Sequence, residues 1–161
     1  MPMIAIGDEE ALYLLEFGER SGLEREIDRL KQKTNAPIVS GTTAPIRLLE
    51  KELSQYFEGK LTEFKTPLFF MGSPFQKKVW EELLKIPFGE RCSYSNIAQA
   101  IGRPTAFRAV ARAISTNQLA IVIPCHRVLS AKGSLSGYAG GLAQKQWLLD
   151  HERKPFINSQ V

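Results

Sequence analysis

A cysteine, a histidine and an arginine stand side by side in the segment Pro-Cys-His-Arg-Val at residues 124–128. Cysteine attacks as its thiolate, and the pKa of a thiol falls when a base or a cation lies beside it, so His126 and Arg127 are suitable neighbours for a nucleophilic Cys125. The preceding residues 119–123 are a β-branched apolar run, which predicts a buried strand that would hold the thiol rigidly at its end. Adjacent side chains on a strand point to opposite faces, however, and a buried cysteine is often inert packing. The pentapeptide alone therefore leaves a reactive cysteine and a packing cysteine both open.

The composition is that of an ordinary globular chain. Its 161 residues are 43% hydrophobic and 24% charged, so they can bury a real core, and this balance excludes disorder, collagen and coiled coil. No apolar run approaches the ~20 residues that span a bilayer, and residues 1–8 lack the basic start and apolar stretch of a secretory signal, so we expect an intracellular protein. Cys92 and Cys125 lack CxxC spacing and, with two histidines, do not suit a structural zinc site, so free thiols in a reducing compartment are expected.

Residues 1–66 predict a small α/β unit. Apolar runs at residues 3–6 and 11–17, separated by a polar Gly-Asp-Glu-Glu turn, indicate the two strands of a hairpin. A helical repeat of apolar side chains starts at Leu23, and Pro45 opens a second helix. Because this unit is acidic and has no obvious chemistry, we interpret it as scaffold.

Residues 67–161 form the predicted second domain, which is mostly helical. Ser73 followed by Pro74 is an N-cap with proline at the first helical position. Two short helices come next, one capped by Ser93 and one starting at Pro104, and together they predict a helix-turn-helix. The second of them carries two arginines four residues apart on an exposed face and several alanines. Such a narrow helix suits close approach to nucleic acid, and it equally suits close helix packing.

Charge is distributed unevenly along the chain. Residues 1–70 carry nine Lys or Arg against twelve Asp or Glu, a net charge of −3. Residues 71–161 carry twelve against five, a net charge of +7. The basic part is a candidate for binding a polyanion, although a solvated basic face would have the same composition.

Several motifs of the second domain together resemble the O6-alkylguanine-DNA alkyltransferases. The resemblance rests on residues 124–128, on Gly-Tyr-Ala-Gly-Gly at 137–141, on Lys-Gln-Trp-Leu-Leu at 145–149 and on the following His151-Glu152. It extends back through Phe75, Gln76, Trp80, the 87–89 turn, Ser93, Tyr94, Arg108, Ala109, Val110 and Asn117, and so covers about residues 66 to 155. Members of this family repair alkylated guanine in duplex DNA by moving the alkyl group onto their own cysteine, without a cofactor and once per molecule.

The resemblance implies a role for each catalytic side chain. Cys125 is implied as the acceptor nucleophile, and His126 as the base that activates it through a bound water. Glu152 would orient and charge-balance the histidine, and Asn117 would stabilise the turn that holds the cysteine. Tyr94 would meet the flipped base and donate a proton as guanine leaves. This is a cysteine version of the arrangement of nucleophile, base and orienting acid.

The resemblance also implies how DNA is held. The target oxygen lies inside a base pair, so the guanine must be swung out, and Arg108 would fill the gap while the second helix of the pair enters the minor groove. The residues implied to contact DNA are Tyr94, Ser95, Arg103, Arg108, Arg127 and Ala131. Those implied to line the alkyl pocket are Ala120, Val128, Ser136, Tyr138 and Ala139. Since Ala120 and Ser136 stand where certain relatives have Pro and Gly, we expect this pocket to hold benzyl groups less well than methyl.

For the whole chain, the resemblance implies a ribonuclease-H-like α/β unit followed by a helical domain with a helix-turn-helix. It implies no metal or other cofactor, and a monomer that acts on double-stranded DNA with no membrane partner. The protein would be cytoplasmic, or nuclear in a eukaryote, and O4-methylthymine is a further candidate substrate. Two other functions are open: a damage-sensing relative that transfers nothing, which usually has Trp in place of Cys125, and a Cys-His hydrolase, which would not need Arg108.

Overall fold

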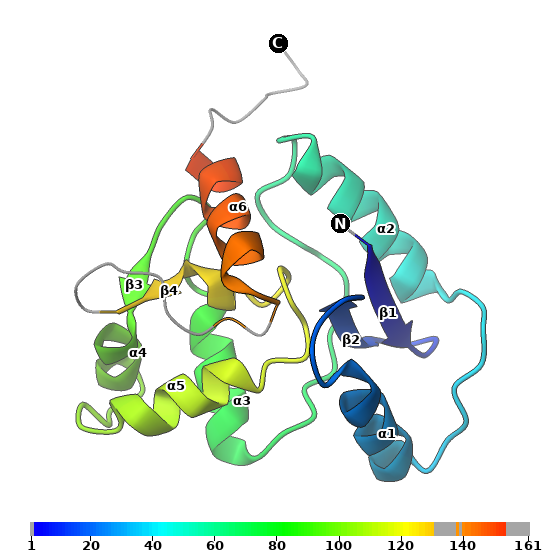
Figure 1. Cartoon of the computed structure of the whole chain (residues 1–161), viewed down its shortest axis with the longest axis horizontal. Coiled ribbons are helices and arrows are strands. Elements are labelled where there is room, and N and C mark those ends of the chain that lie inside the picture. The colour runs from blue at the N-terminus through cyan, green and yellow to red at the C-terminus, as the bar shows by residue number, and fades with distance from the viewer. Residues whose placement is uncertain (1, 131–137, 139, 154–161) are drawn as a thin grey trace.

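The computed structural model describes residues 2–130, 138 and 140–153 and shows a mixed α/β fold (Figure 1). The elements in chain order are β1 (Met3–Gly7), β2 (Leu12–Phe17), α1 (Leu23–Thr34), α2 (Ala44–Phe57), α3 (Pro74–Leu83), β3 (Cys92–Ser93), α4 (Tyr94–Ala100), α5 (Phe107–Ser115), a 3₁₀ turn (Cys125–Arg127), β4 (Val128–Leu129) and α6 (Leu142–Arg153). The hairpin, α1 and α2 lie on one side of the molecule and α3, α4 and α5 on the other (Figure 1). The predicted hairpin and helices are therefore present, and the mixed α/β class is confirmed.

The N-terminal hairpin forms because a polar turn separates two apolar runs. The carboxylate of Asp8 accepts hydrogen bonds from the backbone N–H groups of Glu10 and Ala11, which closes the turn. β1 and β2 then pair antiparallel, with Met3 opposite Phe17. Four of the six residues of β2 are buried hydrophobics, so this strand is covered on both faces. In the described residues this sheet has two strands, and the ribonuclease-H-like arrangement stays a prediction.

The free edge of β2 binds two segments of the predicted second domain, residues 67–161. The N–H of Leu12 donates to the carbonyl of Pro67 at 2.8 Å. Further along, the N–H of Leu15 donates to the carbonyl of Gln118 at 2.8 Å, and its own carbonyl accepts from the N–H of Ala120 at 2.9 Å. These bonds place the segment that precedes the Pro-Cys-His-Arg motif directly against the hairpin.

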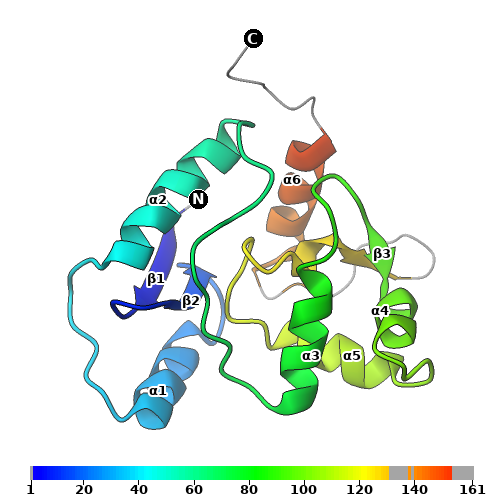
Figure 2. The same cartoon turned by 180° about the vertical axis from the view of Figure 1, so that it is seen from behind.

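Two helices of the predicted second domain, α3 and α4, begin where their caps predict. Ser73 and Gln76 form a capping box at the start of α3, and Ser93 and Asn96 form another at the start of α4. The helix expected to start at Pro104 begins later, at Phe107, because residues 103–106 make a separate turn. The view from behind shows α3, α4 and α5 side by side (Figure 2).

One hydrophobic core joins both halves of the chain. Leu12, Leu15 and Leu49 of the N-terminal part belong to the same buried cluster as Val79, Trp80 and Val110 of the helical part. The indole N–H of Trp80 donates to a carbonyl at the end of α5 at 2.9 Å, which secures α3 against α5. The division at residue 66 remains a prediction, but the packing across it is continuous.

The segment 119–123 is not the buried strand that its composition predicts. Only Leu119 bridges to a strand, and the chain then turns, with Ile121 at φ 70°. The N–H of Ile123 bonds back to the carbonyl of Leu119 at 3.0 Å, and the N–H of Val122 to that of Ala120 at 2.8 Å. All five side chains are nevertheless buried. The apolar run therefore predicts burial correctly and predicts the backbone wrongly, because the turn satisfies its polar groups internally.

No helix in the described part of the chain is long and apolar enough to cross a membrane.

Candidate active site

Cys125 begins the 3₁₀ turn that follows the buried turn 119–123, and it is 7% exposed. The amide Nδ2 of Asn117 lies 3.2 Å from its Sγ and donates to it. The same nitrogen donates to the carbonyl of Ile123 at 3.2 Å, and Oδ1 accepts from the N–H of Leu119 at 2.9 Å. One amide side chain thus closes the turn and contacts the thiol that the turn presents.

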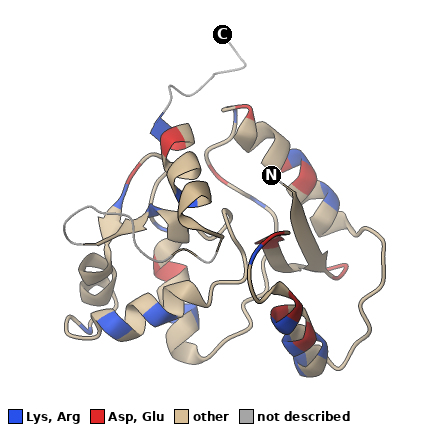
Figure 3. Cartoon of the chain, viewed as in Figure 1, with Lys and Arg blue, Asp and Glu red and all other residues tan. Residues whose placement is uncertain are grey.

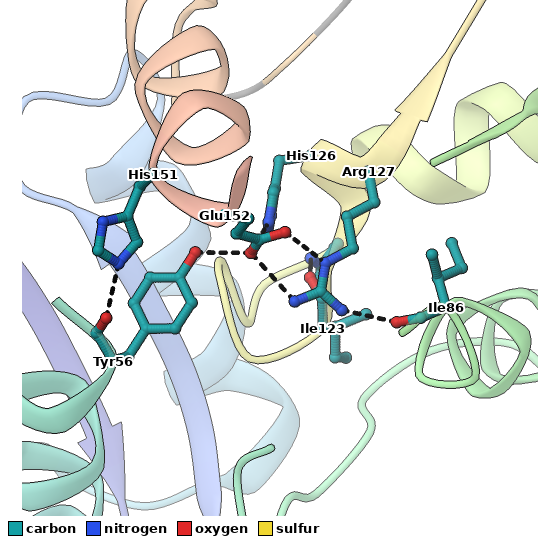
Figure 4. A network of polar contacts seen from close by, with 8 residues as sticks. Tyr56, Ile86, Ile123, His126, Arg127, His151 and Glu152 are labelled. Carbon is teal, nitrogen blue, oxygen red and sulfur yellow. Dashed lines mark hydrogen bonds and ion pairs between the residues drawn. The ribbon is translucent and has the colours of Figure 1, made fainter. Parts of the chain in front are cut away.

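Glu152, near the end of α6, is the centre of a buried polar network (Figure 4). Its Oε2 lies 2.7 Å from Nε2 of His126 and 3.0 Å from Nη2 of Arg127, while Oε1 accepts from Nε of Arg127 at 2.8 Å. The hydroxyl of Tyr56 donates to Oε2 at 2.6 Å. Burial alone would raise the pKa of Glu152, but the hydrogen bonds from His126 and Arg127 more than offset it and hold the pKa far below its usual range. Glu152 is therefore a carboxylate at neutral pH.

His126 is fully buried, and its two ring nitrogens have different surroundings. With Nε2 facing the Glu152 carboxylate, the proton of a neutral imidazole belongs on Nε2, which leaves Nδ1 as a proton acceptor. Among the described residues, Nδ1 has no hydrogen-bond partner. Burial lowers the pKa of His126, and the Glu152 carboxylate opposes this shift. The ring is thus a neutral base, oriented by an acid that stabilises the cation formed when it accepts a proton.

The Cys125 thiol is protonated in this arrangement. Burial raises its pKa to about 11, although the Asn117 hydrogen bond and the Lys145 cation act in the opposite direction. A buried thiol of this kind needs a base at the moment of reaction, since the thiolate is the nucleophile. Lys145, on α6, is itself buried and donates from Nζ to the carbonyl of Val128 at 2.7 Å.

The space in front of the thiol is small. Its lining residues among those described are Glu16, Ile114, Ser115, Asn117, Ala120, Cys125, Tyr138 and Gly140. The room for the centre of a water molecule is ≈ 10 Å³, about enough for a single water. The Tyr138 ring stands edge-on to Phe17, with ring centroids 6.2 Å apart, and its hydroxyl oxygen is buried. A Cβ at Gly140 would lie 2.4 Å from the Phe17 ring, so only glycine fits beside the pocket.

The N-terminal unit contributes two polar side chains that sequence reasoning missed, because it classed this unit as scaffold. Tyr56 reaches Glu152 from α2, and Glu16 reaches the thiol pocket from β2. Burial raises the pKa of Glu16 to about 8, against the attraction of Arg20, whose Nη1 lies 2.7 Å from Oε1. An acidic residue inside an otherwise apolar strand was the available signal for Glu16.

The residues predicted to contact DNA fall into three groups. Arg103 and Arg108 are exposed, and Tyr94 and Ser95 are half-buried on the first turn of α4. Arg127 is only 6% exposed. The last predicted DNA contact, Ala131, lies outside the described residues. Ser136 and Ala139, which are predicted to line the alkyl pocket, also lie outside them.

The prediction that Arg127 contacts DNA disagrees with its position. Its guanidinium binds both oxygens of Glu152, and Nη1 donates to the carbonyl of Ile86 at 2.6 Å. A cation that neutralises a buried carboxylate is not available to a phosphate. Its neighbour His126 takes the other side of the same carboxylate, so the two adjacent side chains serve one group.

No group of three or more His, Cys, Asp or Glu in the described ranges could hold a metal ion.

Comparison with known proteins gives consistent matches. The profile of the 6-O-methylguanine DNA methyltransferase DNA-binding domain matches residues 74–154. A methylated-DNA–protein-cysteine methyltransferase of Mycolicibacterium paratuberculosis is 47% identical over 129 residues, which are 78% of this chain and 78% of that protein. A protein of the same name from Methanosarcina barkeri is 40% identical over 94% of this chain and 90% of its own length.

A solved structure extends the match to three dimensions. The Mycobacterium tuberculosis protein OGT, crystallised in complex with DNA, superposes with a TM-score of 0.79 at 38% identity and covers 94% of this chain and 86% of its own. The profile match spans half of the chain, and the relatives match well beyond it. The chain therefore belongs to the methylated-DNA–protein-cysteine methyltransferase family of DNA-repair alkyltransferases.

Proposed function

We propose that this protein takes the alkyl group from O6 of guanine in duplex DNA and bonds it irreversibly to Sγ of its own Cys125. The observation that carries the proposal is the Cys125 thiol, held by Asn117 next to the buried pair of His126 and Glu152. The thiol proton passes through a water to Nδ1 of His126, and the thiolate attacks the methyl carbon. A carbon–sulfur bond forms, the carbon–oxygen bond breaks, and the leaving guanine is protonated on its ring with help from the Tyr94 hydroxyl.

Each molecule acts once in this scheme. The product is a thioether, from which a thiolate is a poor leaving group, and the groups near Cys125 in the described part of the chain are a neutral imidazole, a carboxylate and an amide, which are too weakly nucleophilic to remove the methyl. A stable S-methylcysteine is therefore the end of the reaction. Methyl transfer is the main activity, with O4-methylthymine as a second substrate.

The lesion is reached by base flipping. α4 and α5 act as a helix-turn-helix, and α5 enters the minor groove. Support comes from the charge of α5, which carries Lys or Arg and no Asp or Glu on its surface (Figure 3). Exposed Arg108 then fills the gap left in the stack, and phosphate contacts make binding salt-sensitive and only weakly dependent on sequence. The protein works as a monomer in the compartment that holds the DNA, the cytoplasm or a nucleus.

Intact mass measurement with peptide mapping tests this proposal. The protein is mixed with a duplex that contains one O6-methylguanine, at several protein-to-lesion ratios. We expect the mass of one CH₂ unit to be gained at Cys125, with repair stopping at one lesion per protein molecule. An unmodified protein that keeps the lesion bound would instead be a damage sensor, and repair of many lesions by unmodified protein would overturn the single-use mechanism.

Replacing Arg108 by alanine should impair base flipping while leaving the binding of duplex DNA largely unchanged. We expect the Arg108→Ala protein to bind undamaged duplex nearly as well as the parent, because many phosphate contacts remain. Its methyl transfer should fall roughly tenfold or more, because the flipped state loses a stabilising side chain worth on the order of 1–2 kcal/mol. The matched control is Arg112→Ala, which removes the other exposed arginine of α5. Equal transfer rates for Arg108→Ala and the parent protein would remove the gap-filling role.

Selectivity for small alkyl groups follows from the pocket. Since Ala120 lines the space before Cys125 and stands where certain relatives have Pro, we expect O6-benzylguanine in a duplex to react at least roughly tenfold more slowly than O6-methylguanine in the same duplex. Competition between the two substrates, read as the mass added to Cys125, measures this ratio. Comparable rates would contradict this selectivity.

A further inference from the structure

The hydroxyl of Tyr56 is not explained by packing. Tyr56 lies at the end of α2, is 1% exposed, and is surrounded by rings. Phe57, Phe64 and Phe88 stand 5.4, 5.6 and 6.0 Å from it between ring centroids. A phenylalanine would satisfy this environment. Burying a phenol instead requires a hydrogen-bond partner, and the partner here is Glu152.

The end of α2 binds two successive residues of α6. The hydroxyl of Tyr56 donates to Oε2 of Glu152 at 2.6 Å, and the Tyr56 carbonyl accepts a hydrogen bond from Nε2 of His151 at 2.6 Å. Oε2 is the oxygen that also contacts His126. Figure 4 shows Tyr56 approaching the carboxylate from the side opposite to Arg127. The carboxylate is thus held between a tyrosine of the N-terminal unit and an arginine of the helical part.

We propose that Tyr56 is a positioning residue for methyl transfer, whose hydroxyl sets the orientation and the hydrogen-bonding strength of the carboxylate that His126 depends on. The proposal rests on the proposed roles of Cys125 and His126. It assigns the N-terminal unit a direct part in the chemistry, because the hydroxyl reaches the same oxygen as the catalytic base.

We expect removal of the Tyr56 hydroxyl to raise the pKa of His126. A hydrogen bond from Tyr56 withdraws charge from Oε2, so the carboxylate attracts the His126 cation less strongly than it would alone. Among the described residues, the other charged groups that act on His126 are Arg127 and Lys145, whose positive charges oppose its protonation. Removing the hydroxyl leaves these two cations in place and strengthens only the attraction to Glu152. His126 then holds a proton up to higher pH, and it cannot act as a base while it does so.

The pH dependence of transfer in Tyr56→Phe tests this inference. The rate constant for a single turnover on a methylated duplex is measured from about pH 5.5 to 9, with protein in excess. We expect the acidic limb of the profile to move upward by about half a pH unit or more, so that the loss of rate is larger at the acidic end. Merely structural damage would lower the rate equally at every pH.

Three further variants test the inference against a control, in a second background and with a stronger donor. Tyr13→Phe is the matched control, since it removes a tyrosine hydroxyl that bonds Asp8 at 2.8 Å in the hairpin turn, and its profile should equal that of the parent. In a Glu152→Gln background, Tyr56→Phe should change the profile no further. A fluorinated tyrosine at position 56 keeps the fold, donates more strongly and should move the acidic limb downward.

Failure of the Tyr56 inference and failure of the proposed function would give different results. A parent-like profile for Tyr56→Phe, or a uniform loss of rate that persists in the Glu152→Gln background, would reduce Tyr56 to packing. A parent protein that gains no methyl group on Cys125 would overturn the proposed function itself, whatever Tyr56 does.

Discussion

We expect the replacement of Cys125 by serine to abolish methyl transfer to the limit of detection and to leave duplex binding intact. The serine hydroxyl fits the same turn and can keep a hydrogen bond from Asn117, so the surface that meets DNA is unchanged. An alcohol, however, is a much weaker acid than a thiol, and a neutral histidine cannot convert it to a useful nucleophile toward a methyl carbon. Intact mass after incubation with a methylated duplex, together with a binding titration, measures both quantities.

Cys92→Ser is the control for this variant. Cys92 is the second thiol, and burial raises its pKa to about 11 as well. Its backbone pairs with Val128 in the short β3–β4 ladder, but its side chain contributes nothing to the thiol pocket. Full transfer by Cys92→Ser together with none by Cys125→Ser identifies the acceptor. Residual methylation of Cys125→Ser at another residue would contradict the assignment.

Replacing Glu152 by glutamine should lower the rate of methyl transfer by roughly 10² to 10⁴, the usual contribution of an acid–base pair. The amide has nearly the same shape as the carboxylate, but it carries no charge to stabilise the His126 cation. It can also turn its NH₂ group toward Arg127, which would leave that cation buried without a counter-charge. Single-turnover kinetics on a methylated duplex measure the loss, and a rate within a few fold of the parent would contradict the orienting role.

The same substitution should change how stability depends on pH. Glu152 has a folded-state pKa well below the ordinary value of 4.5, so its charge stabilises the fold above that pH, and this stabilisation is lost as the pH falls toward the folded-state pKa. Glu152→Gln removes this contribution and also leaves Arg127 unpaired, at a cost of about 3 kcal/mol near neutral pH. Denaturant unfolding at several pH values should show the two proteins converging below about pH 4.5. A difference that stays constant down to acid pH would mean that the carboxylate is not charged in the fold.

Local sequence signals predicted most of the helices because their causes are local. Ser73 and Ser93 cap α3 and α4 through their own side chains, and Pro74 suits the first helical turn. The turn 119–123 could not be predicted in this way. Its backbone depends on the Asn117 amide and on the edge of β2, which is about a hundred residues away in the chain.

The sequence by itself determined the chemistry of this protein: a cysteine beside a histidine, a distant glutamate in a recognisable motif, and a basic helical half. Only the tertiary structure decided which groups share one carboxylate. Arg127 is buried on Glu152, although the family resemblance implied a DNA contact, and Tyr56 comes from a unit interpreted as scaffold. The physical reason is that a buried charge must collect its partners from whichever elements pack around it, and chain order does not reveal those elements.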